Sequence, residues 1–114
     1  MESFRQFPRE EKWSPGEKKV ARRAYDKAFE RQCATITKEA ARMLEMATSP
    51  SDLWRVHDHL SKQRDTVDRN YDYRYSKLLI VFAVLMREGW LAEADLAGID
   101  AEKITEIKFM ADIG

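Results

Sequence analysis

The stretch SDLWRVHDHLSKQR, residues 51–64, gathers the side chains of this chain that are most able to do chemistry. Its two histidines, His57 and His59, could bind a metal ion, but on a helix they are separated by about 200°. Two metal ligands on one helix normally lie four residues apart. We therefore expect no metal site, and we interpret His59 as a surface histidine.

Catalysis is the second possibility, because Ser61 lies four residues after His57 and Asp58 is next to that histidine. No nucleophile elbow or glycine-rich phosphate loop accompanies them. Asp58 is also followed four positions later by Lys62, a spacing typical of stabilising surface pairs on a helix. We expect no catalytic residues and no cofactor; a small enzyme that uses His57, Asp58 and Ser61 remains an alternative.

A surface that holds another protein accounts better for the same residues. On a helical wheel with Trp54 at zero, His57 and Arg64 lie about 60–80° to one side, beside Leu53 and Leu60. Arg64 therefore lies within an apolar stripe, where a charge without a counter-charge is costly. Trp54 is an anchor of the kind that dominates protein interfaces.

The guanidinium of Arg64 should meet a carboxylate, and Asp58 of the same chain points roughly 120° away from it. We expect the carboxylate to come from Asp58 or Asp52 of a second subunit. The alternative is that Arg64 extends into water while Trp54 packs on the preceding helix. The predicted partner-binding residues are Leu53, Trp54, His57, Asp58, Leu60 and Arg64.

Composition excludes several classes of protein. The chain has 114 residues, with 20 basic and 20 acidic side chains, so it lacks the basic excess of a nucleic-acid binder. Its single cysteine, Cys33, excludes a disulfide framework, and we expect this residue to be a small buried side chain. The longest apolar run, residues 78–86, is too short to span a bilayer. We expect a cytoplasmic protein.

Helix signals recur along the chain. Ser14, Pro15 and Glu17 form the start of a helix with a capping box. Apolar residues then follow at steps of three or four, which predicts a helix over residues 15–47 of roughly 50 Å. That stripe comprises Ala21, Tyr25, Phe29, Cys33, Ile36, Ala40, Met43 and Ala47.

A second start signal stands at Ser49 and Pro50, and helical spacing continues from there to Gly89, a predicted C′ residue. The polar segment 68–75 could kink or interrupt this second helix, and its tyrosines are expected to pack where the hairpin enters the head. One further turn is predicted between residues 90 and 96, and a last helix after Asp100.

These elements predict an all-α chain: a flexible tail over residues 1–13 and one helical domain over residues 14–114. Within it, residues 14–70 form a long antiparallel hairpin, or stalk, and residues 71–114 form a small helical head. A two-helix hairpin cannot bury both of its apolar stripes by itself, so we expect a homodimer.

The pattern DLWxxHDxLSxxRxxxDxxYDxRxS, from Asp52 to Ser76, closely resembles the fluorescence recovery protein family. The resemblance extends over roughly residues 13–110. It implies a small, helical, dimeric adaptor that binds the light-activated orange carotenoid protein and speeds its return to the resting form. It also implies that Trp54, His57, Asp58 and Arg64 line a patch tied to dimerisation and activity.

The head resembles the family's surface region for client binding, which places Ile80, Phe82 and Glu106 in it. An aromatic residue would be expected near Ile80 and a basic one near Glu106. Relatives also occur in bacteria that lack the orange carotenoid protein, and this chain could come from outside the cyanobacteria. The alternative function is therefore a dimeric helical scaffold, or a chaperone-like protein, with an unrelated client.

Overall fold

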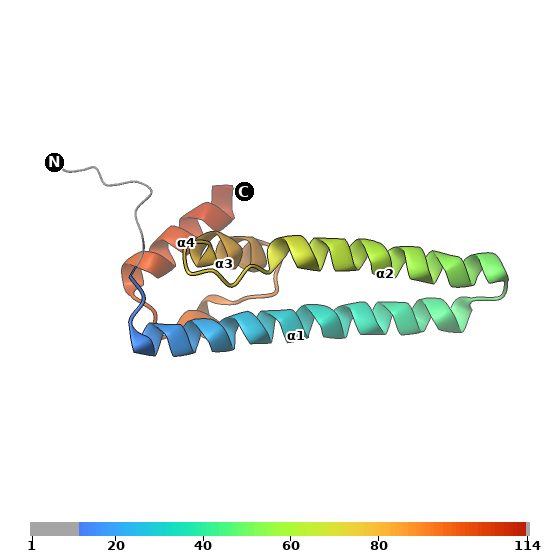
Figure 1. Cartoon of the computed structure of the whole chain (residues 1–114), viewed down its shortest axis with the longest axis horizontal. Coiled ribbons are helices and arrows are strands. Elements are labelled where there is room, and N and C mark those ends of the chain that lie inside the picture. The colour runs from blue at the N-terminus through green and yellow to red at the C-terminus, as the bar shows by residue number, and fades with distance from the viewer. Residues whose placement is uncertain (1–11, 114) are drawn as a thin grey trace.

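The structure, a computed structural model, describes residues 12–113, and all regular elements in this range are helical. The helices, labelled in Figure 1 except for the short η2, are α1 (Pro15–Met46), α2 (Pro50–Asn70), α3 (Leu78–Arg87), the 3₁₀-helix η2 (Glu93–Leu96) and α4 (Ala101–Ile113). The all-α prediction is confirmed. Phe4 and Phe7 of the predicted tail lie outside the described residues.

The two long helices begin at the predicted caps. Ser14 accepts a hydrogen bond from the backbone N–H of Glu17 at 3.1 Å and donates its own N–H to the Glu17 carboxylate at 2.9 Å. At the start of α2, the Ser49 hydroxyl accepts from the N–H of Asp52 at 3.3 Å. These side chains satisfy N–H groups that have no partner within a helix. The capping box and the second cap are confirmed.

The second helical segment is interrupted after Asn70, within the polar segment 68–75 where the sequence allowed either a kink or a break. The segment 71–77 is not helical. Within it the Asp72 carboxylate accepts from the backbone N–H of Arg74 at 3.2 Å and from its guanidinium. Such local bonding competes with helix formation. Of the two outcomes that the sequence allowed, the structure shows the interruption: α2 ends at Asn70 with 21 residues, whereas α1 has 32.

The head has a core of its own, made by the first half of α1 together with α3, η2 and α4 (Figure 1). Three alanines of α1, at positions 21, 24 and 28, are fully buried, and their small side chains let η2 approach α1 closely. The largest side chains buried completely in this core are Phe82, Leu78, Leu85, Leu96 and Ile107.

Trp13 also belongs to the head core. Its side chain is 8% exposed and its ring lies 6.1 Å from that of Tyr75. Its assignment to the flexible tail was therefore wrong. The predicted tail included Trp13 because the helical pattern of the sequence begins only at Ser14. An aromatic side chain can nevertheless be buried without belonging to a helix.

Beyond the head, α1 and α2 continue as an antiparallel hairpin, and the molecule measures 65 × 24 × 22 Å (Figure 1). Its radius of gyration is 17.7 Å, compared with about 13 Å for a compact domain of this length. The extended hairpin and the small head match the predicted architecture. The outer half of the hairpin, away from the head, is thus exposed on most of its sides.

Candidate protein interface on the helical hairpin

Large apolar side chains are exposed along one side of the hairpin. On α2, Leu53 is 48% exposed, Trp54 60% and Leu60 40%. Leu44 of α1 is 50% exposed and lies on the same side of the hairpin. In an antiparallel pair, residues that are rotated by the same angle from the contact line between the two helices lie on the same side. We call this surface, made by Leu44, Leu53, Trp54 and Leu60, the apolar seam.

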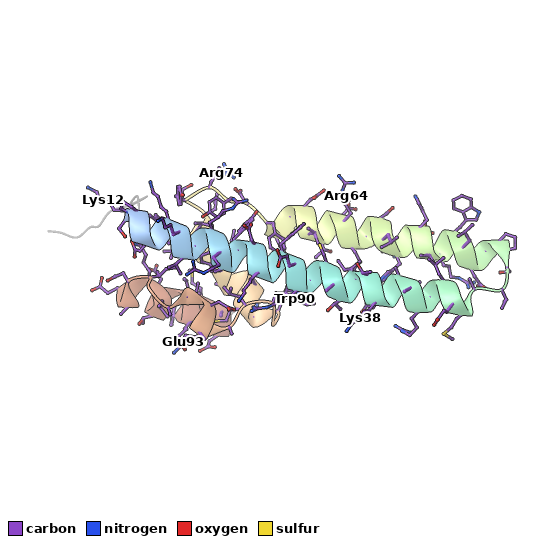
Figure 2. All side chains as sticks on the ribbon, turned by 90° about the horizontal axis from the view of Figure 1, so that it is seen from below. Lys12, Lys38, Arg64, Arg74, Trp90 and Glu93 are labelled. Atoms are coloured by element: carbon purple, nitrogen blue, oxygen red, sulfur yellow. The ribbon has the colours of Figure 1, made fainter. Side chains whose placement is uncertain are left out.

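Polar groups accompany the seam. His57 places its ring 6.0 Å from that of Trp54, and its Nδ1 is 3.5 Å from the Asp58 carboxylate, which is long for a hydrogen bond. Arg64 follows on the same side, and its side chain is 80% exposed. Figure 2 shows Arg64 and Lys38 projecting from opposite edges of the hairpin.

Arg64 has a carboxylate near it within the single chain. Its Nε lies 3.7 Å from the carboxylate of Asp68, four residues later on the same helix. This pair is open to water and is worth little by itself. The pairing of Arg64 with a carboxylate of a second subunit stays a prediction. Trp54 does not pack on α1, so that half of the alternative interpretation was wrong.

Few side chains of α2 are buried against α1. Val56 is the one side chain of α2 that is buried. His59 also faces α1, with its Nε2 3.4 Å from Glu39, and its side chain is only 27% exposed. The interpretation of His59 as a surface histidine was therefore wrong. Cys33, expected to be buried, is half-buried.

The head presents two of the three predicted client-binding residues. Ile80 is 55% exposed and Glu106 is also exposed. Phe82 is completely buried, so its prediction as a surface contact was wrong. Residues 78–86 are apolar almost without interruption, and such a run does not show which of its side chains face outward.

The tyrosines at the junction pack between the hairpin and the head, as predicted. Tyr71 donates to Oε1 of the buried Gln32 at 3.0 Å and meets the ring of Tyr25 edge-on. Burial raises the pKa of Tyr71, and it also raises the pKa of Tyr73 to about 12. Both phenols thus remain neutral and contribute to packing.

Sequence reasoning missed a buried ion pair in the head. The ammonium of Lys103 lies 3.1 and 3.2 Å from the two carboxylate oxygens of Glu17. It also donates to the backbone carbonyl of Lys12 and lies 4.8 Å from the centre of the Trp13 ring. Glu17 was identified as a cap, but no local signal relates it to a lysine so distant in the sequence.

Burial on its own would raise the pKa of Glu17. Hydrogen bonds from the backbone N–H groups of Ser14 and Asp100, together with the Lys103 ammonium, outweigh burial and lower the pKa below its usual value. This ion pair joins the start of α1 to α4, and it keeps the head closed around Trp13.

The structure also bears on the possibilities of a metal site, a membrane-spanning helix and a catalytic site. Within residues 12–113, no three metal-binding side chains come together. No helix in that range has the length and apolar character needed to cross a membrane. His57, Asp58 and Ser61 all lie on an exposed helix surface, which is an arrangement suited to contact with a protein rather than to enclosing a small substrate.

Comparisons with known proteins agree with this arrangement. The family model described as "Photoprotection regulator fluorescence recovery protein" matches residues 13–111. Over 99 residues the chain is 33% identical to the fluorescence recovery protein of a Synechocystis species, and the match covers 87% of this chain and 91% of that protein.

Solved structures are also similar. The fluorescence recovery protein of Fremyella diplosiphon superimposes with a TM-score of 0.84 at 37% identity, over 89% of this chain and 99% of that one. The protein from Synechocystis sp. PCC 6803 gives the same TM-score at 33% identity and the same coverage. The likeness therefore includes both the hairpin and the head.

Proposed function

Since this chain belongs to the fluorescence recovery protein family of photoprotection regulators, we propose that it binds the photoactivated orange carotenoid protein and speeds its return to the resting form. The observation that carries this proposal is the family match over residues 13–111, which includes the whole seam and nearly all of the head. It acts without catalytic residues, in the cytoplasm.

The mechanism of such a regulator is differential binding. A protein shifts a conformational equilibrium of its client only if it binds one conformation more tightly than the other. To accelerate recovery, the chain must bind the transition state toward the resting form more tightly than it binds the photoactivated form. A rigid, extended surface suits this role, because it can match one arrangement of the client and not the other.

We further propose that the working form is a homodimer in which the apolar seam of one chain packs on that of its partner. Burial of exposed apolar side chains contributes about 25 cal/mol per Å², and Leu53, Trp54 and Leu60 are all about half exposed in the single chain. The Arg64–Asp68 pair would be shielded from water in that interface. A guanidinium and a carboxylate from each chain could then also pair across it.

The direct test is the rate at which photoactivated orange carotenoid protein returns from red to orange in the dark. We expect the rate to rise with the concentration of this protein until the carotenoid protein is saturated. An unchanged rate at excess protein would refute the proposed client. The homodimer is a separate proposal. The molar mass of the protein in solution should therefore be measured on the same sample.

The head supplies an observation that favours a second candidate. Glu106 is an exposed acid where the family resemblance led us to expect a basic residue, and Ile80 is an exposed aliphatic where we expected an aromatic one. A scaffold with a different protein client would account for both. Co-purification from the native cell distinguishes the two candidates, because the first requires the orange carotenoid protein among the bound proteins.

A further inference from the structure

The outer side of α1 in the head is basic. Between Lys18 and Glu30 the helix exposes five lysine and arginine side chains and carries two acidic ones. Lys19, Arg23 and Lys27 are spaced four residues apart, so they form one ridge along the helix. We call these three residues, together with Arg22, the basic ridge. A shallow hollow of about 560 Å³ is lined by these four cations together with Asp26 and Glu30.

Part of this ridge is held in place before any partner binds. The guanidinium of Arg22 lies 4.5 Å from the centre of the Tyr73 ring and 5.4 Å from that of Tyr25, and its Nε is 3.4 Å from Asp26. Lys19, Arg23 and Lys27 form no ion pair with any residue of the described range 12–113. Within the described residues, one fixed cation is therefore flanked by three that have no carboxylate in ion-pair contact. Lys27 is nevertheless near enough to Asp95 that its charge, after the hydrogen bonds from Arg31, helps to lower the pKa of that carboxyl.

The charges of the head are segregated, although the chain as a whole is neutral. Acidic side chains are concentrated on η2, α4 and the turns beside them. They are Glu88, Glu93, Asp95, Asp100, Glu102, Glu106 and Asp112. Figure 2 shows Glu93 and Arg74 at opposite edges of the head. Two of these acidic side chains are ion-paired, Glu93 with Lys108 at 3.0 Å and Asp95 with Arg31 at 2.7 Å. Such a distribution orients the molecule in the field of a charged partner.

The ridge continues the direction of the apolar seam. Lys19 and Leu44 are 25 residues apart on α1, which places them within about 20° of each other around the helix. In the proposed dimer the seam is covered by the second chain, so a client on this side meets the cations of the head at the edge of that interface.

We propose that the basic ridge binds an acidic surface of the client and orients the client on the head; this inference rests on the proposed function. A protein partner fits better than a nucleic acid or an anionic membrane. The acidic side chains elsewhere on the head would repel the continuous phosphates of a nucleic acid or the surface of an anionic membrane, whereas a protein partner can place its carboxylates opposite the four cations alone. The ridge also spans only about 12 Å and offers four cations, fewer than the six to ten phosphate contacts of a typical strong DNA binder.

The test compares two double variants with the same change of charge on the same helix. K19E/R23E reverses two cations of the ridge. K38E/R42E reverses a lysine and an arginine at the same spacing on the stalk, where Lys38 projects from the edge opposite to Arg64 (Figure 2). The affinity of each for photoactivated orange carotenoid protein is measured at low and at high salt, with molar mass and circular dichroism recorded alongside.

We expect K19E/R23E to bind about tenfold more weakly than the unsubstituted chain at low salt, with a smaller dependence of affinity on salt, and K38E/R42E to stay within about twofold. Equal affinities of the two variants would overturn the inference. So would loss of the dimer in K19E/R23E alone, because the ridge would then contact a second copy. If the unsubstituted chain does not bind at all, the proposed function fails first and the inference fails with it.

Discussion

Along α1, the alanines at positions 21, 24 and 28 are fully buried beneath the helices of the head, whereas no side chain of the same helix is buried beyond Gln32. On the antiparallel neighbour α2, Val56 is the one buried side chain. The head therefore completes its core within one chain, and the outer half of the hairpin does not.

This difference teaches where an interaction is needed. The head has a complete core within one chain, because side chains of α3, η2 and α4 form one buried cluster with the alanines of α1. The hairpin has two helices and no third layer, so its apolar seam faces solvent until another protein covers it. The same helix thus serves as part of a core at one end and as an incomplete interface at the other.

The largest effect is expected from removing a core side chain of the head. Phe82→Ala should lower the free energy of unfolding by about 3–5 kcal/mol, because it leaves a cavity where the side chain was completely buried. Val56→Ala in the hairpin should cost about 2 kcal/mol or less. Urea unfolding of both variants measures the two values, and similar losses would show that the two regions are stabilised alike.

Next in size is the buried ion pair of the head. Glu17→Gln leaves the Lys103 ammonium buried without its counter-charge, which typically costs about 3 kcal/mol or more. Glu102→Gln, a change at an exposed neighbour of Lys103, is the control and should leave the free energy of unfolding within about 0.5 kcal/mol of its original value.

The same pair predicts a pH dependence. The pKa of Glu17 is below its usual value of 4.5 in the folded chain, so the folded state binds the proton less readily than the unfolded state does. The stabilisation is fully present above about pH 4.5 and is lost as the pH falls through the lowered pKa. Glu17→Gln should abolish this loss; an unchanged acid dependence would show that other carboxylates cause it.

A charge placed in the seam should separate the two chains without disturbing the head. In Leu53→Glu, like charges would meet near the twofold axis, and we expect the dissociation constant of the dimer to rise at least about 100-fold. Light scattering should give the mass of a single chain. Lys62→Glu, which places the same acidic side chain outside the seam on α2, is the control and should stay dimeric; a dimeric Leu53→Glu would place the interface elsewhere.

The smallest effect distinguishes Arg64 from its neighbours. Arg64→Ala should weaken the dimer by about 1 kcal/mol, a change of roughly fivefold, because Arg64 lies beside the seam. Lys62→Ala, which removes a charge outside the seam, should have no measurable effect. Equal effects on the dissociation constant would mean that Arg64 remains in water in the dimer as it does in the single chain.

Sequence alone predicts those parts of the fold that are determined locally. The caps at Ser14 and Ser49, the glycine at the end of α3 and the outward position of Leu53 all follow from residue type and spacing. Gly89 has φ +89°, as a C′ residue requires. The seam was predictable for the same reason, since an apolar stripe that exceeds what one partner helix can cover must remain exposed.

Contacts between distant residues were not predictable in this way. Lys103 meets Glu17, and Trp13 is buried, only because α4 returns to the start of α1. Phe82 was expected at the surface because α3 is apolar on all sides, so its sequence does not show which side faces the core and which faces solvent. Asp68, which lies one turn after Arg64 on the same helix and 3.7 Å from its Nε, was also not considered as a partner of Arg64.

Hydrogen exchange of backbone amides, followed as the protein is diluted, tests most directly whether the outer hairpin depends on a second chain. We expect amides of residues 36–64 to lose protection as the dimer dissociates, while those of α3 keep theirs, because only the head retains a core in the separated chain. Protection of residues 36–64 that does not change with concentration would contradict this account.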